Sequence, residues 1–356
     1  MDWLRPFRLR RNIFSGLLHI ALVTIVAGAC VTHFWGVQGE IHLRADKAET
    51  LTVKPSAIST EKAVSLFLWD FQIVEDKDGN PADYITELRL LDRTKAKSND
   101  FMAVDSGTIR MNKPFKYHGF RFCQSDYDSD LMGVVLTYNY DPWGIGITYA
   151  GYALLLVSMS GFFFQLKTRF RALWKNLTSS SPLSGKIGVG GLFAFVIIMA
   201  VVMTKVVTPK PPLQPVLQTP LLGIHVSVIM LAYTLFAVIM VDGILGLCVK
   251  KWRKVLLQLS QILLYPALFC LTAGIFIGAV WANMSWGRYW GWDPKETWAL
   301  ITMLVYAAIL HWPLIDNLTA KRSQIAYHVV SIIAFFFVLF TYFGVSYLLG
   351  GLHSYA

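Results

Sequence analysis

Long apolar runs alternate with short hydrophilic links over most of the chain. Seven of these runs are close to 20 residues long, the length that crosses the hydrocarbon core of a bilayer as an α-helix. The pattern predicts a polytopic α-helical membrane protein with about seven transmembrane helices. The predicted helices span about 13–35, 146–166, 187–207, 222–247, 257–281, 297–315 and 325–350.

The segment 36–143 departs from this pattern. It is charged, and apolar and polar residues alternate in Leu66–Val74 and Ile85–Leu91, which is typical of half-buried strands. Asp78-Gly79 lies between these two runs and favours a hairpin turn. We therefore expect a β-rich extracytoplasmic domain, inserted after the first helix.

Composition supports the membrane assignment. The chain is 55% hydrophobic and 15% charged, with a mean hydropathy of +0.49, whereas soluble proteins of this length carry more charge. The four cysteines show neither a Cys-x-x-Cys nor a zinc spacing, so no disulfide framework or redox pair is predicted. The first apolar run is too long for a cleavable signal peptide.

Basic residues predict the orientation in the membrane. The N-terminus and the links on its side of the predicted helices carry fifteen Lys and Arg, and those on the other side carry four. Because cytoplasmic links are enriched in these residues, the N-terminus is predicted inside. The β-rich domain, the segment 286–298 and the C-terminus are then outside. The net charge of +10 is explained by topology in the lipid bilayer, so nucleic acid is not an expected partner.

The segment Trp286–Trp298 combines aromatic and charged residues between two apolar runs. Asp293-Pro-Lys-Glu296 is a good start for a helix. Two interpretations remain open: an aromatic belt at the membrane surface, or a shelf that is apolar on one side and can hydrogen-bond on the other. The aromatic candidates are Trp286, Trp290, Trp292 and Trp298, with Asp293 beside them.

Four of the eight histidines fall at two predicted depths. His225 and His353 lie at outer helix ends, level with Trp286–Trp298. His19 lies roughly 10 Å into the first helix from the inside, at 1.5 Å per residue. His311 lies roughly 8 Å from the inner surface of a 30 Å core. The second pair is therefore predicted to share one depth.

Histidine inside a membrane indicates a functional site by default. Two level pairs suit two axial ligands on haem iron, and a flat porphyrin suits indole rings, with Arg288 or Lys295 near its propionates. The alternative is that each histidine only hydrogen-bonds a neighbouring helix. His328 is an alternative to His311, and His33 is an alternative to His19.

Several segments together resemble a known family. Trp-Gly-x-x-Trp-x-Trp-Asp-Pro-Lys-Glu-x-Trp at 286–298 resembles the "WWD" signature of the haem-handling proteins of cytochrome c maturation. The segment Pro215–Tyr233, the helix ending at His311 and Gly-Leu-His353-Ser-Tyr resemble the CcsA/ResC branch. Residues 1–165 resemble a compact CcsB/ResB portion, through Leu68-Trp-Asp-Phe71, Met111-Asn-Lys-Pro114, His118–Gln124 and Tyr140-Asp-Pro-Trp143.

The resemblance to a fused system II cytochrome c synthase implies three portions. These are a CcsB/ResB-like portion at 1–165, a connecting helix and outer loop at 166–221, and a CcsA/ResC-like haem-handling core at 222–356. It implies haem b at an outer site held by His225 and His353. His19 and His311 would form a transmembrane pair on the route of haem from the inside. The expected location is the bacterial cytoplasmic membrane.

The implied activity is that of a cytochrome c haem lyase, or holocytochrome c synthase. Two thiols of a Cys-x-x-Cys-His motif in apocytochrome c add to the haem vinyl groups on the outer face, and a thioredoxin-like protein is the expected source of reduced thiols. No catalytic acid or base is assigned; Asp293 and Glu296 are expected to cap the helix that follows. The alternatives are a bis-histidine membrane cytochrome b and a haem transporter without lyase activity.

Overall fold

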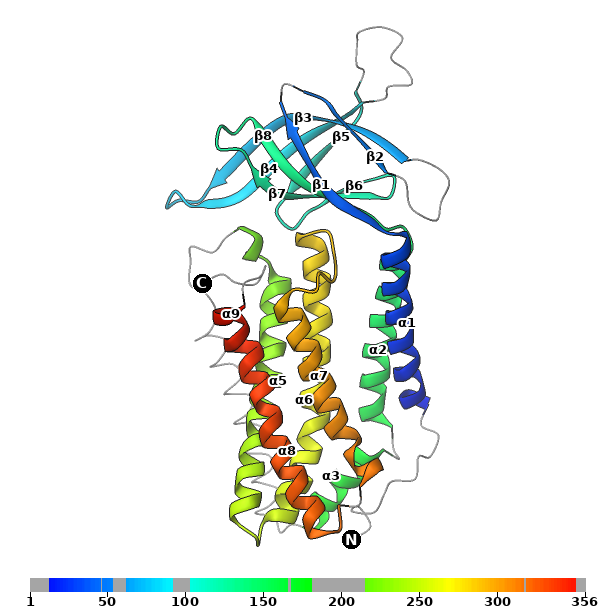
Figure 1. The fold of residues 1–356 in the computed structure, drawn as a ribbon, viewed down its shortest axis with the longest axis vertical. Helices are drawn as coiled ribbons and strands as arrows, with labels where there is room; N and C mark the ends of the chain where they lie inside the picture. The colour runs from blue at the N-terminus through cyan, green and yellow to red at the C-terminus, as the bar shows by residue number, and fades with distance from the viewer. Residues whose placement is uncertain are drawn as a thin grey trace.

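A β-domain stands on one end of a set of long helices (Figure 1). This architecture agrees with the polytopic helical protein and the inserted β-rich domain that the sequence predicts. The computed structural model describes residues 13–45, 47–53, 62–91, 103–165, 168–180, 215–316 and 318–349.

The β-domain contains two four-stranded antiparallel sheets. Sheet A has the strand order β1-β8-β7-β6, and sheet B has the order β2-β3-β4-β5. The first and last strands of the domain, β1 and β8, are thus neighbours, and they leave the domain beside the helices that precede and follow it. The strands are β1 Val37–Arg44, β2 Glu49–Val53, β3 Lys62–Glu75, β4 Pro81–Leu91, β5 Ala103–Arg110, β6 Phe115–Tyr117, β7 Phe120–Tyr127 and β8 Gly133–Tyr140.

Alternating side chains of both sheets make the core of this domain. Leu66 and Leu88 of sheet B and Phe122 and Leu136 of sheet A are at most 1% exposed and belong to one cluster. The predicted hairpin is confirmed: β3 and β4 pair, and Gly79 takes a φ of 80° in the turn between them. A residue with a Cβ rarely adopts that backbone conformation.

Each predicted apolar run forms a described helix, except 187–207, which lies outside the described residues. Five segments are long and apolar enough to cross a membrane: Ile13–Trp35, Gly144–Leu177, Pro220–Cys248, Arg253–Ser285 and Lys321–Leu348. The predicted run 297–315 also forms a helix, α7. The helices are α1 Ile13–Trp35, α2 Gly144–Phe164, α3 Arg169–Ser180, α5 Pro220–Cys248, α6 Arg253–Ser285, α7 Pro294–Ile315, α8 Lys321–Leu339 and α9 Val345–Leu348, with a π-turn, η3 Phe340–Gly344, joining the last two.

The polar link after α2 is more ordered than the sequence pattern indicates. We expect only a hydrophilic connection at 167–186, and the structure forms the amphipathic helix α3 there. Leu173 and Leu177 of this helix pack on Ile262 of α6, and Gln258 donates a hydrogen bond to the Leu173 carbonyl at 2.7 Å. The apolar face of α3 is short and lies among basic residues. The sequence pattern therefore indicates a polar link there and no membrane span.

Helices α1 and α2 form a pair at one side of the other helices (Figure 1). Glycines allow their close approach. A Cβ on Gly28 would lie 2.7 Å from the backbone nitrogen of Thr148, and a Cβ on Gly151 would lie 3.0 Å from the nitrogen of Ile25. Small residues let backbones come together in membranes, where packing rather than water drives association.

This packing predicts that Gly28→Leu separates the pair. An added side chain has no room against the backbone of α2, so we expect a loss of about 1–3 kcal/mol of stability and a lower midpoint of thermal unfolding in detergent. Gly16→Leu is the matched control, because nothing lies within 4 Å of its Cβ position. An equal midpoint for both variants would refute the close-packing argument.

Candidate functional site

The tryptophan-rich stretch, Trp286–Trp298, forms the turn between α6 and α7 at the end of the helices that carries the β-domain (Figure 1). Helix α6 ends where the Trp286 N–H bonds the Ala282 carbonyl at 2.8 Å. Gly287 then reverses the chain with a φ of 75°. Trp292 also has a positive φ, 55°. The residue is 70% exposed, so burial of its own side chain does not stabilise this conformation. That conformation costs a non-glycine residue roughly 1–2 kcal/mol, so the turn must be held by its other contacts.

A capping box at the start of α7 supplies part of that hold. The Asp293 carboxylate accepts a hydrogen bond from the Lys295 N–H at 3.0 Å. The Glu296 carboxylate reaches back to the N–H groups of Gly291 at 2.8 Å and Asp293 at 3.2 Å. The helix start that the sequence predicts at Asp293-Pro-Lys-Glu296 is confirmed, and such caps contribute about 1 kcal/mol each.

The β-domain holds the turn from above. Asn139 of β8 donates a hydrogen bond to the Gly287 carbonyl at 2.7 Å, and Arg121 of β7 donates to the Asn283 carbonyl at 3.3 Å. Between them, Cys123 lies so close to Gly287 that a Cβ there would be 3.2 Å from its sulfur. Burial raises the pKa of the Cys123 thiol to about 11, so this thiol is neutral and unreactive.

A series of hydrogen-bonded hydroxyl groups connects the turn to α1 and α2. Thr148 of α2 donates to the Tyr289 hydroxyl at 3.4 Å, Tyr289 donates to Thr32 of α1 at 3.0 Å, and Thr32 donates to Asp141 at 2.6 Å. The hydroxyls of Tyr289 and Thr32 each accept one of these bonds and donate the next, and the series ends on a carboxylate. Tyr289 is 7% exposed, so the chain lies in a low-dielectric setting where such networks are strong.

The tryptophans do not form one flat surface. Trp290 and Trp292 meet edge to face with centroids 5.9 Å apart. Trp286 instead packs against Trp281 of α6, with centroids 4.8 Å apart, and Trp298 packs against Phe340, with centroids 4.3 Å apart. Trp292 is exposed, whereas Trp290 is half-buried and packs on the helical core, so the turn has an open aromatic corner at Trp292 with Trp290 behind it.

His225 projects from the second turn of α5 toward α6. Its Nδ1 lies 2.8 Å from the Gly274 carbonyl oxygen, and its ring covers Gly278, whose Cβ would be 2.6 Å from Cε1. A carbonyl only accepts, so Nδ1 carries the hydrogen and the lone pair lies on Nε2. This is the orientation in which a backbone carbonyl fixes a metal-binding histidine. Gly278 precedes Trp286 by eight residues, about 12 Å along α6.

His19 and His311 adopt the same arrangement on their own helices. Nδ1 of His19 lies 2.6 Å from the Ser15 carbonyl, and Nδ1 of His311 lies 2.7 Å from the Ala307 carbonyl. Both side chains are exposed at the surface of the protein, again with the Nε2 lone pair directed away from the bond. The structure records no contact between these two described histidines.

The remaining candidates behave differently. His328 is fully buried, its Nε2 lies 3.3 Å from the Arg253 carbonyl, and a Cβ on Gly246 would lie 2.6 Å from its ring, so a macrocycle has no room there. His33 is exposed and contacts the ring of Phe34. His353 lies outside the described residues. Arg288 and Lys295, the candidates for propionate contact, are both half-buried in the turn.

Sequence reasoning missed the residues that hold the turn from other parts of the chain. Arg121 and Asn139 are two polar residues among many in alternating strands, and only the docking of sheet A on the turn gives them a role. Tyr289 stands inside the tryptophan-rich stretch, and its partners Thr32 and Thr148 lie in two other helices. A polar residue at the outer end of an apolar run was the signal available for Thr32.

Comparisons with known proteins cover nearly the whole chain. Residues 145–353 match the family described as Cytochrome C assembly protein, and residues 11–146 match the ResB-like family. The two matches meet at the junction between the β-domain and α2.

Individual relatives agree with these matches. The chain is 39% identical over 185 residues to Protein NrfI of Wolinella succinogenes, which covers 49% of this chain and 20% of that protein. It is 37% identical over 164 residues to the cytochrome c biogenesis protein CcsA of Chlamydomonas reinhardtii, which covers 43% of this chain and 45% of that protein. The chain thus matches less than half of either relative. It belongs to the Cytochrome C assembly protein family and joins a ResB-like portion to it in one polypeptide, the fused CcsB/CcsA arrangement.

Proposed function

We propose that this multi-pass membrane protein carries haem to the outer face of a bacterial cytoplasmic membrane and attaches it there to apocytochrome c. The main support is the shared arrangement of His19, His225 and His311. In each, Nδ1–H is held by a backbone carbonyl and the lone pair is on Nε2, the tautomer of imidazole that binds haem iron.

In this proposal haem is the substrate, and the chain supplies its binding and orientation. His225 and His353 hold the iron at the outer site, while the exposed Trp292, with the half-buried Trp290 beside it, offers an aromatic surface for the porphyrin. His19 and His311 form the transmembrane pair on the path from the inner side. A fixed turn favours the reaction because the haem vinyl groups and the thiols of the apocytochrome must be held close together and correctly oriented.

The covalent step needs no acid or base from the chain. Each thiol of the Cys-x-x-Cys-His motif adds across one vinyl double bond: sulfur bonds to one vinyl carbon and the hydrogen goes to the other. Nothing is oxidised or reduced overall, provided that the thiols arrive reduced, for which a thioredoxin-like protein is the proposed partner. The histidine of the motif then replaces one of His225 or His353 on the iron, which weakens the hold on the product.

Asp293 and Glu296 keep a structural role in this proposal. Both carboxylates accept hydrogen bonds from backbone N–H groups of the turn, so neither is available as a proton donor. Their effect on the reaction is to fix the position of Trp290 and Trp292.

Two other functions fit part of the site. A bis-histidine membrane cytochrome b would use the same tautomers, and a haem transporter would use an inner and an outer site. Neither gives a role to an aromatic corner that is exposed beside a β-domain. Co-expression with an apocytochrome in cells that lack their own maturation system separates the three. Only a synthase yields haem that stays with the cytochrome polypeptide during denaturing, acidified extraction.

His225→Ala tests the outer site. Loss of one axial ligand should change the absorption spectrum of the co-purified haem and abolish cytochrome maturation, while the amount of inserted protein stays the same. Ser227→Ala is a matched control, because this residue is exposed on the same turn of α5 and bonds only its own helix. Normal maturation in His225→Ala would contradict the ligand assignment.

His19→Ala and His311→Ala test the transmembrane pair. Each removes a proposed ligand of the inner haem, so the haem that co-purifies with the protein should fall. The measurement is the haem-to-protein ratio after purification. A normal ratio in His19→Ala together with a loss in His33→Ala would show that the ligand on α1 is His33.

A further inference from the structure

One carboxyl group lies among the membrane helices without a described cationic partner. Asp242 of α5 is 5% exposed. Ser260 of α6 donates a hydrogen bond to its Oδ2 at 3.3 Å, and no other described residue bonds this carboxyl group. On the next residue, Gly243, a Cβ would lie 3.1 Å from the His328 carbonyl oxygen, so the backbone of α8 packs closely beside it. Asp242 is therefore enclosed between α6 and α8.

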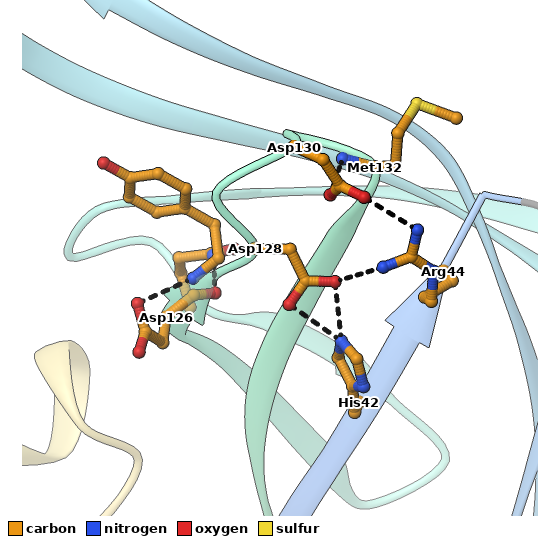
Figure 2. A network of polar contacts seen from close by, with 8 residues as sticks. His42, Arg44, Asp126, Asp128, Asp130 and Met132 are labelled. Carbon is orange, nitrogen blue, oxygen red and sulfur yellow. Dashed lines mark hydrogen bonds and ion pairs between the residues drawn. The ribbon is translucent and has the colours of Figure 1, made fainter.

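Two carboxylates of the β-domain have the partners that Asp242 lacks. Figure 2 shows Arg44 and His42 converging on Asp128, with Arg44 at 2.7 Å and His42 at 3.0 Å, and Arg44 also meets Asp130 at 2.9 Å. These side chains are between 24% and 50% exposed, so water solvates their charges as well. A carboxylate with neither water nor a cation is so unfavourable that it binds a proton or another cation.

Basic side chains at the same end of the helices bond other groups. Arg253 of α6 donates to a main-chain carbonyl of α5 at 2.9 Å, and Arg169 of α3 donates to Gln261 at 3.0 Å. The Nε2 of His328 lies 3.3 Å from the Arg253 carbonyl oxygen. The described residues also contain no group of three or more His, Cys, Asp or Glu side chains that could hold a metal ion. A proton is therefore the cation that fits Asp242.

Buried hydroxyl groups extend the polar surroundings of Asp242 toward α7. The Tyr327 side chain of α8 lies within electrostatic reach of Asp242, and Tyr306 of α7 lies within reach of Tyr327. Both tyrosines are fully buried, and neither hydroxyl has a hydrogen-bond partner among the described residues. Polar groups thus continue from Asp242 to the helix that carries His311.

Asp242 and His311 lie at the same depth. The rings of Phe236 in α5 and Tyr306 in α7 stack with centroids 3.7 Å apart, which sets the level of one helix against the other. Both helices run from the end that carries the β-domain toward the opposite end (Figure 1). Asp242 follows Phe236 by six residues and His311 follows Tyr306 by five, which is about 9 Å and about 8 Å along the two helices. The carboxyl group is thus level with a proposed ligand of the inner haem.

Charge connects the two positions. Haem b with two histidine ligands is negatively charged in both oxidation states, because its two propionates outweigh the charge of the iron–porphyrin centre. An ionised Asp242 at the same depth would repel it, and this repulsion is strong in a medium of low dielectric constant. We propose that Asp242 binds a proton, and that haem loading at His19 and His311 requires this proton. The step rests on the proposed function above, in which these histidines hold haem inside the membrane.

The linkage has a definite direction. Protonated Asp242 is neutral, so haem meets no opposing charge. As the pH rises and the carboxyl group loses its proton, the haem affinity of the inner pair should fall. Bound haem should in turn favour the protonated form, because linkage between two binding events is reciprocal. Protonation of the ligand histidines weakens haem binding at acidic pH in every variant, so a comparison of variants at the same pH isolates Asp242.

Haem titration of the purified full-length protein, followed by absorption, tests the linkage. The inner-site signal is the part that is lost in His311→Ala. Asp242→Asn keeps the shape of the side chain and stays neutral at every pH. We expect this variant to match the native protein at acidic pH and to bind haem about tenfold more tightly than the native protein at alkaline pH, within the range typical of coupling between two sites.

Asp316→Asn is the matched control. It removes the same charge at the inner end of α7, five residues after His311, but Asp316 is exposed and accepts a hydrogen bond from Ser323 at 2.6 Å. Water and salt screen such a charge, so its haem affinity should follow the native pH dependence. Equal pH dependence in the native protein and Asp242→Asn, or an equal effect of Asp316→Asn, would overturn the proposal.

Infrared spectroscopy gives a second readout, on the carboxyl group itself. A protonated carboxyl group has a C=O stretching band that is separate from the bands of carboxylates, and the band that Asp242→Asn lacks belongs to Asp242. In the native protein at alkaline pH, this band should grow when haem is added. A band that stays the same at every pH, with or without haem, would identify a permanently protonated structural residue and refute the linkage.

Failure of the proposed function has a different signature. If His311→Ala bound as much haem as the native protein, the inner pair would not be a haem site, and both the proposed haem route and the linkage would be refuted. If the inner-site signal were present but independent of Asp242, the haem route would stand and the proton linkage alone would be refuted.

Discussion

The tryptophan-rich turn between α6 and α7 is held in place through the hydroxyl group of Tyr289. Tyr289 accepts a hydrogen bond from α2 and donates one to α1, so a side chain from the tryptophan-rich stretch ties the first two described helices to the rest of the bundle. Asn139 and Arg121 add the β-domain to the same point. Three parts of the chain that are distant in sequence thus converge on a few residues between α6 and α7. The ResB-like portion and the assembly-protein portion are joined there physically as well as covalently.

Because contacts from both portions meet at this turn, the fusion of the two portions stabilises a strained backbone conformation. An exposed tryptophan with a positive φ is unfavourable by itself, and the capping box, the hydroxyl chain and sheet A together offset that strain. Strained residues persist where the surroundings over-determine them, and they cluster at sites that bind or react. The proposed outer site is thus built less from its own segment than from contacts that arrive from both portions.

The sequence predicted most of the architecture because the signals were local. Apolar runs near 20 residues marked the helices, alternation marked β3 and β4, and Asp293-Pro-Lys-Glu296 marked the start of α7. It could not predict that Trp286 and Trp298 turn away to pack on Trp281 and Phe340. The direction of each ring depends on which helices pack together, and the spacing of apolar residues along the sequence does not indicate this. The roles of Tyr289 and Asn139 were hidden for the same reason, and the domain boundaries at 165 and 221 remain predictions.

Cys123 makes the joint between the two portions observable. It is 2% exposed against Gly287, and its raised pKa keeps the thiol protonated near neutral pH, so a water-soluble alkylating reagent reaches it only when sheet A lifts from the turn. With the other three cysteines replaced, its labelling rate measures how often the joint opens, in the way that amide exchange reports local opening. Cys123 thus reports how often the ResB-like portion and the assembly-protein portion separate at this contact.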